Sequence, residues 1–121
     1  MNASPTHRDL AAWREAMRLV KIIYRETANF PKEEVFGLTA QIRRSAISIP
    51  SNIAEGAARN TSGELMQFLG IACGSLAELE TQLELSVELG YLNPEANAIS
   101  LTSRVGMLVR LLRKSLRDST R

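Results

Sequence analysis

Four glutamates come nearest to a catalytic or metal-binding set in this sequence: Glu78, Glu80, Glu84 and Glu88. Clustered carboxylates can perform general acid–base catalysis or hold a cation. A di-iron site in a helical bundle would combine such glutamates with Glu-x-x-His motifs, and the sequence contains none. Because Glu80, Glu84 and Glu88 recur every four residues, they repel one another on a helix unless cations face them. We therefore predict salt bridges here, with Arg104 close to Glu80.

The other reactive residue types do not form a catalytic set either. His7 is the only histidine, and we expect it to be exposed near the start of the chain. Cys73 is the only cysteine, and its apolar setting, GIACGSL, favours a buried and inert thiol. A single cysteine also fits a reducing cytoplasm. With no GxxxxGK(S/T) phosphate loop, the sequence predicts no enzyme, no metal site and no cofactor.

The elements that position these residues are helices, because apolar residues recur at intervals of three and four. Thr61 and Glu64 form a capping-box pattern, Gly90 suits a helix C-cap, and the Asn-Pro-Glu of residues 93–95 resembles a helix start. Apolar runs are too short for a membrane span. We predict an all-α, antiparallel up-down-up-down four-helix bundle. It forms one domain over residues 1–121, with helices at about 9–28, 34–59, 62–90 and 95–118.

A proline lies in the middle of the second predicted helix. The helical spacing of apolar residues continues on both sides of it, at Leu38, Ile42, Ala46, Ile49, Ile53 and Ala57. We therefore predict one helix that runs through Pro50 and is kinked there. The proline lacks an N–H and displaces the carbonyl of Ala46, a defect of about 3 kcal/mol. We expect Ser48, Ser51 and Asn52 to satisfy that carbonyl.

Small polar and amide residues follow one face of the second and third predicted helices. Serine and asparagine are poor helix formers, so they are unusual choices for a free helical surface. We interpret this set as a packed polar seam, either inside the bundle or between subunits; the alternative is a solvated face. Its members are Gln41, Arg44, Ser48, Asn52, Glu55, Ser75, Glu78 and Gln82.

Charge is distributed unevenly along the chain, although the net charge is only +2. Residues 61–93 contain no lysine or arginine, whereas residues 94–121 contain six. In an up-down bundle, one end would collect Arg8, Arg14, Arg59, Arg110, Arg113, Lys114, Arg117 and Arg121. We interpret this basic end as a candidate phosphate-contacting surface. The alternative is purely structural, because cations near a helix C-terminus complement its dipole.

Three stretches closely resemble one known family: DLAAWREAMRLV, FPKEEVFGLTAQIRRSAISIPSNIAEGAARNTSGE and FLGIACGSLAELETQLELSVELGYL. The family consists of four-helix-bundle proteins first noticed as reading frames in intervening sequences of bacterial 23S ribosomal RNA genes. The resemblance covers about residues 9–92, and its most specific motifs are QIRR at 41–44, SIPSNIAEG at 48–56 and GSLAELE at 74–80. It implies a left-handed bundle that assembles as a ring, typically a pentamer.

The resemblance also bears on function. The family has no established biochemical role, and RNA or DNA binding is inferred for it. Its fold is similar to that of the accessory proteins of diversity-generating retroelements, which bind a reverse transcriptase and nucleic acid. Our first hypothesis is a non-catalytic, oligomeric protein that binds structured RNA through its basic end, with Arg43 and Arg44 joining that end or holding the seam. The alternative is a scaffold that recruits a protein partner, such as an enzyme acting on nucleic acid.

Overall fold

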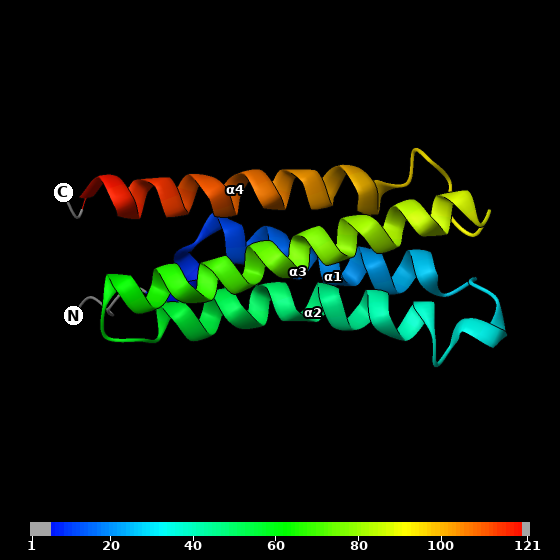
Figure 1. Ribbon diagram of the computed structural model, residues 1–121, viewed down its shortest axis with the longest axis horizontal. Coiled ribbons are helices and arrows are strands. Elements are labelled where there is room, and N and C mark those ends of the chain that lie inside the picture. Colours follow the sequence, from blue (N-terminus) through cyan, green and yellow to red (C-terminus); the bar gives the residue numbers. More distant parts are fainter. Residues whose placement is uncertain (1–5, 120–121) are drawn as a thin grey trace.

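Four helices form the molecule, as the computed structural model, which describes residues 6–119, shows (Figure 1). The helices are α1 (Ala11–Thr27), α2 (Leu38–Ala57), α3 (Ser62–Glu88) and α4 (Asn97–Ser119), with short 3-10 turns η1 (His7–Asp9) and η2 (Lys32–Glu34). No strand occurs within the described part of the chain. Successive helices run in opposite directions, so both chain ends lie at the same end of the bundle. The prediction of an all-α four-helix bundle is confirmed.

The core lies along the bundle axis and draws on all four helices. Around the axis, α2 packs between α1 and α3, and α4 packs against α3 and α1. Side chains with no exposed surface come from each helix, among them Leu19, Ile49, Leu79 and Val105. Their three-and-four spacing buries one stripe per helix, which is the physical basis of the bundle. Between residues 6 and 119, no helix is long and apolar enough to cross a membrane.

Both ends of α3 follow local sequence signals. At its start, the hydroxyl of Thr61 accepts a hydrogen bond from the backbone N–H of Glu64 at 3.1 Å. At its end, Gly90 adopts a φ of +80°, and the N–H of Tyr91 donates to the carbonyl of Ser86 at 2.9 Å. This is a Schellman-type C-cap, in which glycine takes the left-handed position without strain. Thr61 and Gly90 therefore have the predicted capping roles, whereas the Glu64 carboxylate accepts from the Thr61 hydroxyl rather than from its backbone N–H, so the capping box is only half formed.

Three helices begin later than predicted, α1 by two residues because the 3-10 turn η1 precedes it. A 3-10 turn occupies residues 32–34, and α2 starts only after Gly37, with its Leu38 N–H donating to the Glu34 carboxylate at 3.2 Å. Likewise, α4 starts at Asn97, although residues 93–95 carry the signals of a helix start. Its cap comes from α1, because Glu26 accepts hydrogen bonds from the first two N–H groups of α4 at 3.1 and 2.9 Å. A carboxylate there also complements the helix dipole.

The second helix continues through its proline, as the spacing predicts. The expected partner of the freed Ala46 carbonyl is not found among the neighbouring polar side chains. Ser51 donates instead to the carbonyl of Ile47 at 2.8 Å, and Asn52 donates to the carbonyl of Ser48 at 2.8 Å. These bonds to the carbonyl four residues earlier are the ordinary local choice of short polar side chains in a helix. The kink at Pro50 stays a prediction.

Candidate functional site

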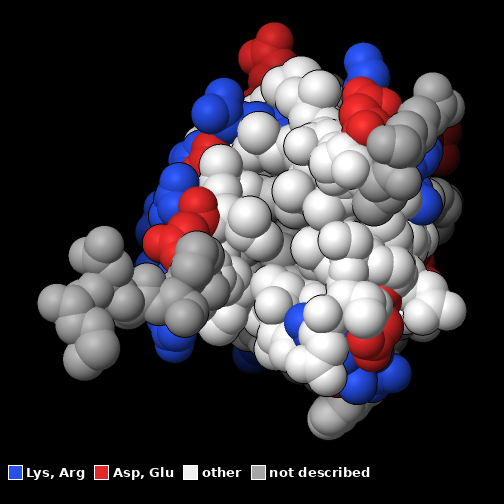
Figure 2. Space-filling view, turned by 90° about the vertical axis from the view of Figure 1, so that its left-hand side faces the viewer, with Lys and Arg blue, Asp and Glu red and all other residues white. Residues whose placement is uncertain are grey.

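The end of the bundle at which the termini lie carries charged side chains around a largely uncharged centre (Figure 2). Lysine and arginine side chains stand at the rim, with acidic side chains beside them. Six of the predicted basic residues are exposed and Arg113 is half-buried, while Arg121 lies outside the described residues. The six exposed residues are Arg8, Arg14, Arg59, Arg110, Lys114 and Arg117. The cations thus form a discontinuous rim rather than one solid patch.

Part of this rim is held by contacts within the chain. Arg14 donates to the backbone carbonyl of Arg8 at 2.9 Å. Arg59 lies 3.9 Å from the Glu55 carboxylate, and its guanidinium stands over the ring of Phe68, 4.9 Å from the ring centre. The ion pair is exposed, and such pairs contribute at most about 1 kcal/mol. These contacts orient Arg14 and Arg59 at the rim.

Arg113 lies between α3 and α4. Its Nη1 is 3.8 Å from the sulfur of Cys73, and its Nε is buried without a hydrogen-bond partner. Gly70 of α3 lies beside this guanidinium, and a Cβ there would make an ordinary van der Waals contact with Nη2 of Arg113 at 3.7 Å. Arg110 packs instead along its own helix, where a Cβ on Gly106 would lie 3.1 Å from its Nη1. Of these two arginines, only Arg113 therefore folds onto the facing helix.

The polar seam lies between α2 and α3. Ser45 donates to the Glu78 carboxylate at 2.6 Å, and the hydroxyls of Ser48 and Ser75 are 2.7 Å apart. Asn52 donates to the Ser48 hydroxyl at 2.9 Å. The Ser48–Ser75 bond is neutral, and such bonds contribute about 0.5–1.5 kcal/mol, whereas the bond from Ser45 is made to a carboxylate. These two bonds join α2 to α3, and the Asn52 bond stays within α2.

The remaining predicted seam residues do not join this hydrogen-bonded set. Gln82 is buried, and its Oε1 has no hydrogen-bond partner. Gln41, Arg44 and Glu55 are exposed on α2. Ser45 follows the same face of α2 as Ser48; it is buried, bonds directly to α3 and belongs to the seam.

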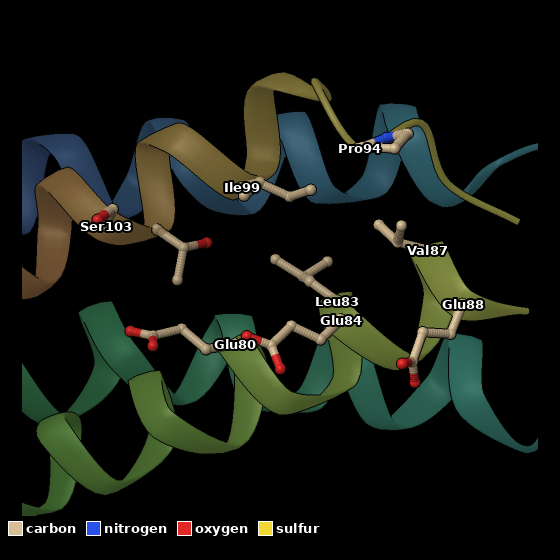
Figure 3. Close-up of a pocket in the computed structure, with 9 residues that line it drawn as sticks. Glu80, Leu83, Glu84, Val87, Glu88, Pro94, Ile99 and Ser103 are labelled. Atoms are coloured by element: carbon tan, nitrogen blue, oxygen red, sulfur yellow. The ribbon is translucent and has the colours of Figure 1, made fainter. Parts of the chain in front are cut away.

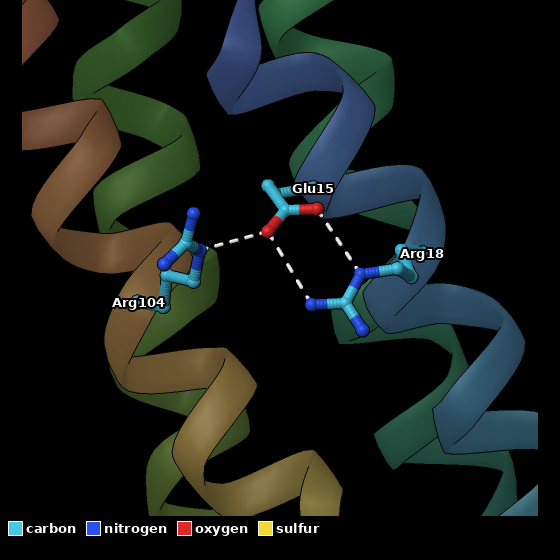
Figure 4. A network of polar contacts seen from close by, with 3 residues as sticks. All are labelled: Glu15, Arg18 and Arg104. Carbon is cyan, nitrogen blue, oxygen red and sulfur yellow. Dashed lines mark hydrogen bonds and ion pairs between the residues drawn. The ribbon is translucent and has the colours of Figure 1, made fainter.

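A charged cluster joins α1 to α4 (Figure 4). Arg104 donates to the Glu15 carboxylate at 2.8 Å, and Arg18 reaches the same carboxylate at 3.1 and 3.3 Å. The hydrogen bond from Arg18, followed by that from Arg104, holds the pKa of Glu15 below its ordinary value, although burial opposes the shift. The predicted pairing of Arg104 with Glu80 is wrong, because Arg104 faces α1 rather than α3.

One exposed apolar surface was missed by the sequence patterns. Phe36 is 94% exposed, and its neighbour in the chain, Val35, is 50% exposed. Val35 lines one shallow hollow together with Tyr24 and Ile47, which are also exposed. Arg43 stands over the ring of Tyr24, 4.4 Å from its centre. It also donates to the hydroxyl of Thr27 at 3.0 Å, so Arg43 connects α2 to α1. Helical periodicity gives no sign of this surface, because its members come from three separate segments.

The structure also shows the surroundings of the side chains that could bind a metal or take part in catalysis. Between residues 6 and 119, no group of three or more histidine, cysteine, aspartate or glutamate side chains could hold a metal ion. His7 packs edge-on against Trp13, with ring centres 4.9 Å apart. Cys73 is half-buried rather than fully buried, and its thiol faces Arg113. Within the described residues, His7 therefore makes a ring contact and Cys73 lies beside a guanidinium, and neither forms a pair of base and nucleophile.

Comparison with known proteins identifies relatives. The family model described as 23S rRNA-intervening sequence protein matches residues 8–114. A crystal structure of a protein of unknown function from the S23 ribosomal protein family of Bacteroides thetaiotaomicron is similar in fold, with a TM-score of 0.77. The two chains are 23% identical, and the match covers 86% of this chain and 99% of that one. A comparison with curated proteins finds no match. The chain therefore belongs to the family of 23S rRNA-intervening sequence proteins.

Proposed function

We propose that this protein is a non-catalytic, cytoplasmic homo-oligomer that binds structured RNA through the basic end of the bundle. The observation that carries the proposal is the rim of exposed lysines and arginines contributed by η1, α1, α4 and the segment after α2 (Figure 2). Two acids at the same end are engaged in capping turns, since Asp9 accepts from the Thr6 N–H and Glu64 contacts Thr61. Phosphate oxygens are the natural counter-charge for such a surface.

Self-assembly would strengthen this surface. Five copies in a ring, each with a net charge of +2, would carry about +10 in total. The rims of all copies would face the same side if the ring axis ran parallel to the bundles. A weak phosphate contact in one subunit would then become multivalent, which raises the overall affinity without any new contact. We infer a ring of five from the family resemblance described above.

The test is a titration of a fluorescently labelled RNA hairpin across salt concentrations. Each neutralised phosphate contributes about −0.7 to −0.9 to the slope of log affinity against log salt. The double variant Arg110→Gln, Lys114→Gln removes two exposed rim cations and should make the slope shallower. The matched control, Lys21→Gln, Arg25→Gln, removes two exposed cations from α1 away from the rim and should leave the slope unchanged.

Two results would contradict the proposal. One is the absence of RNA binding at low salt, which would make the rim structural. The other is an equal loss of slope in both double variants, which would mean that net charge rather than the rim attracts RNA. Light scattering on the same samples measures the mass of the assembly. A mass equal to that of one subunit would contradict the proposed ring. A DNA duplex titrated in parallel shows whether binding requires RNA.

A second function is favoured by the exposed apolar surface at the turn between α1 and α2. A phenylalanine that is 94% exposed suits a contact with another protein. In this alternative, the assembly is a scaffold that recruits a protein partner, such as an enzyme acting on nucleic acid. The variant Phe36→Ser would then abolish partner capture while leaving the RNA titration unchanged. If the Phe36→Ser variant still captured the partner protein, this surface would not be the partner-binding site.

A further inference from the structure

A groove of about 440 Å³ lies between α3 and α4, toward the end of the bundle opposite the termini (Figure 3). Leu83 and Val87 of α3 and Ile99 of α4 point into the space between the two helices and form its floor. Leu83 is buried, whereas Val87 and Ile99 are half-buried and open toward the groove. The floor is therefore apolar and within reach of a partner.

One wall of this groove is acidic. Glu80, Glu84 and Glu88 stand along α3 and are all exposed. Successive members are separated by one helical turn, about 6 Å along the axis. The facing wall on α4 is neutral, with Thr102 and Ser103, and the hydroxyl of Thr102 is already bonded to the carbonyl of Ala98 at 2.6 Å. Among the described residues that line the groove, none is a lysine or arginine.

The missing cation is a consequence of the packing of α4. Arg104 would be the natural partner of Glu80, but it pairs with Glu15 of α1. Residues 61–93 contain no lysine or arginine. Like charges four residues apart destabilise a helix by a few tenths of a kcal/mol per pair. The three carboxylates therefore repel one another in the isolated chain, and a cation from outside would relieve this repulsion.

We propose that this groove binds a basic amphipathic helix of a partner protein. Apolar side chains at helical spacing on the partner would lie on Leu83, Val87 and Ile99, as in other helix-in-groove complexes. Lysines or arginines beside that apolar stripe would pair with the carboxylates of α3, because both sets repeat with the helical period. The acidic wall spans about 12 Å, or two helical turns, which matches a short helical segment.

Charge and shape distinguish this partner from others. Nucleic acid is disfavoured, because its phosphates would face three carboxylates. A hydrated metal ion would gain nothing from the apolar floor. The site is separate from the basic rim, so the proposal does not rest on RNA binding. A second copy of this chain is the remaining competitor, and the experiment includes it.

The probe is a fluorescein-labelled synthetic peptide of 18 leucine and lysine residues, with the leucines on one helical face. Fluorescence anisotropy should show saturable binding to the full-length protein, weakened by salt because the contacts are exposed ion pairs. The double variant Glu80→Gln, Glu84→Gln should bind about tenfold more weakly, since each exposed pair contributes up to about 1 kcal/mol. The matched control, Glu33→Gln, Asp118→Asn, removes the same charge from exposed residues outside the groove and should bind as the wild type does.

Two further peptides test the floor and the charge separately. A scrambled leucine–lysine peptide with no apolar face should bind weakly, and a leucine–glutamate peptide should not bind. The proposal is overturned if the original peptide does not bind at low salt, if both double variants bind it equally, or if either control peptide binds as well as the original one. It is also overturned if Glu80→Gln, Glu84→Gln reduces the mass of the unliganded assembly, because another copy would then occupy the groove.

Discussion

Replacing Gly56 by alanine should destabilise the protein, even though alanine is the better helix former. Gly56 lies in the last turn of α2, where the helix packs against the first turns of α3. A Cβ at this position would lie 2.7 Å from the Cβ of Phe68 and 3.0 Å from Cδ1 of Leu65. The Cβ of Phe68 cannot rotate away, because it is fixed to the backbone. Relief therefore requires α2 and α3 to move apart.

Two opposing contributions set the change in the free energy of unfolding caused by Gly56→Ala. Alanine is favoured over glycine in a helix by up to about 1 kcal/mol. Overpacking a close contact typically costs about 1–3 kcal/mol. Because the shortest distance at Gly56 joins two Cβ atoms, we expect the upper part of that range. The net loss should be about 1–2 kcal/mol in the free energy of unfolding, which lowers Tm by roughly 4–8 °C for a chain of this length.

The assay is urea denaturation followed by circular dichroism at one fixed protein concentration, because assembly makes apparent stability concentration-dependent. Gly74 provides the matched control. It is exposed on α3, and no atom lies within 4 Å of a Cβ built there. Gly74→Ala should therefore stabilise the protein by about 0.5–1 kcal/mol. Stabilisation by both substitutions would refute the close approach of α2 and α3 at Gly56.

Three further predictions concern single residues. Glu15→Gln should reduce the loss of stability at acid pH. The bonds from Arg18 and Arg104 lower the pKa of Glu15 in the folded protein. The carboxylate therefore stabilises the fold above its ordinary pKa, and this stabilisation is lost as the pH falls through the folded-state pKa. Urea denaturation at several acid pH values measures this. Gly90→Ala should cost about 1–2 kcal/mol in the same assay, because a φ of +80° strains alanine. Glu26→Gln should weaken the cap of α4 by about 0.5–1 kcal/mol and speed amide exchange in its first turn.

Each of these has a result that contradicts it. Parallel pH profiles for wild type and Glu15→Gln would show that this carboxylate does not couple to folding. Unchanged stability in Gly90→Ala would mean that the turn after α3 adopts another conformation. Unchanged exchange at the start of α4 in Glu26→Gln would place the cap elsewhere.

Features set by neighbours in the chain were predictable. The caps of α3 are an example, because Thr61 and Glu64 are three residues apart and Gly90 follows directly on its helix. The continuity of α2 through Pro50 also followed from local spacing, since a loop would not preserve the apolar register. Each of these signals lies within a single helix or at its ends, and a periodic pattern in the sequence describes a single helix.

Features set by contacts between helices were not predictable in the same way. Glu26 caps α4 from more than seventy residues away, so the Asn-Pro-Glu signal at 93–95 marks only a turn. Arg104 had carboxylates available on both α1 and α3, and the rotation of α4 about its own axis decides between them. That rotation is determined by core packing, which placed Arg104 against Glu15. The sequence pattern gives the spacing of side chains but not this rotation.

The same rotation of α4 separates the two proposed surfaces. Because Arg104 pairs with α1, the groove glutamates Glu80, Glu84 and Glu88 have no counter-charge among the described residues that line the groove, while Lys114 remains exposed at the other end of α4. From Ser103 in the groove to Lys114 at the rim is about 16 Å at 1.5 Å per residue. Ionic screening at physiological salt acts over about 8 Å, so the acidic groove and the basic rim affect each other little. RNA and a basic partner helix should therefore bind together without competing, and displacement of the leucine–lysine peptide by saturating RNA would show that they share one surface.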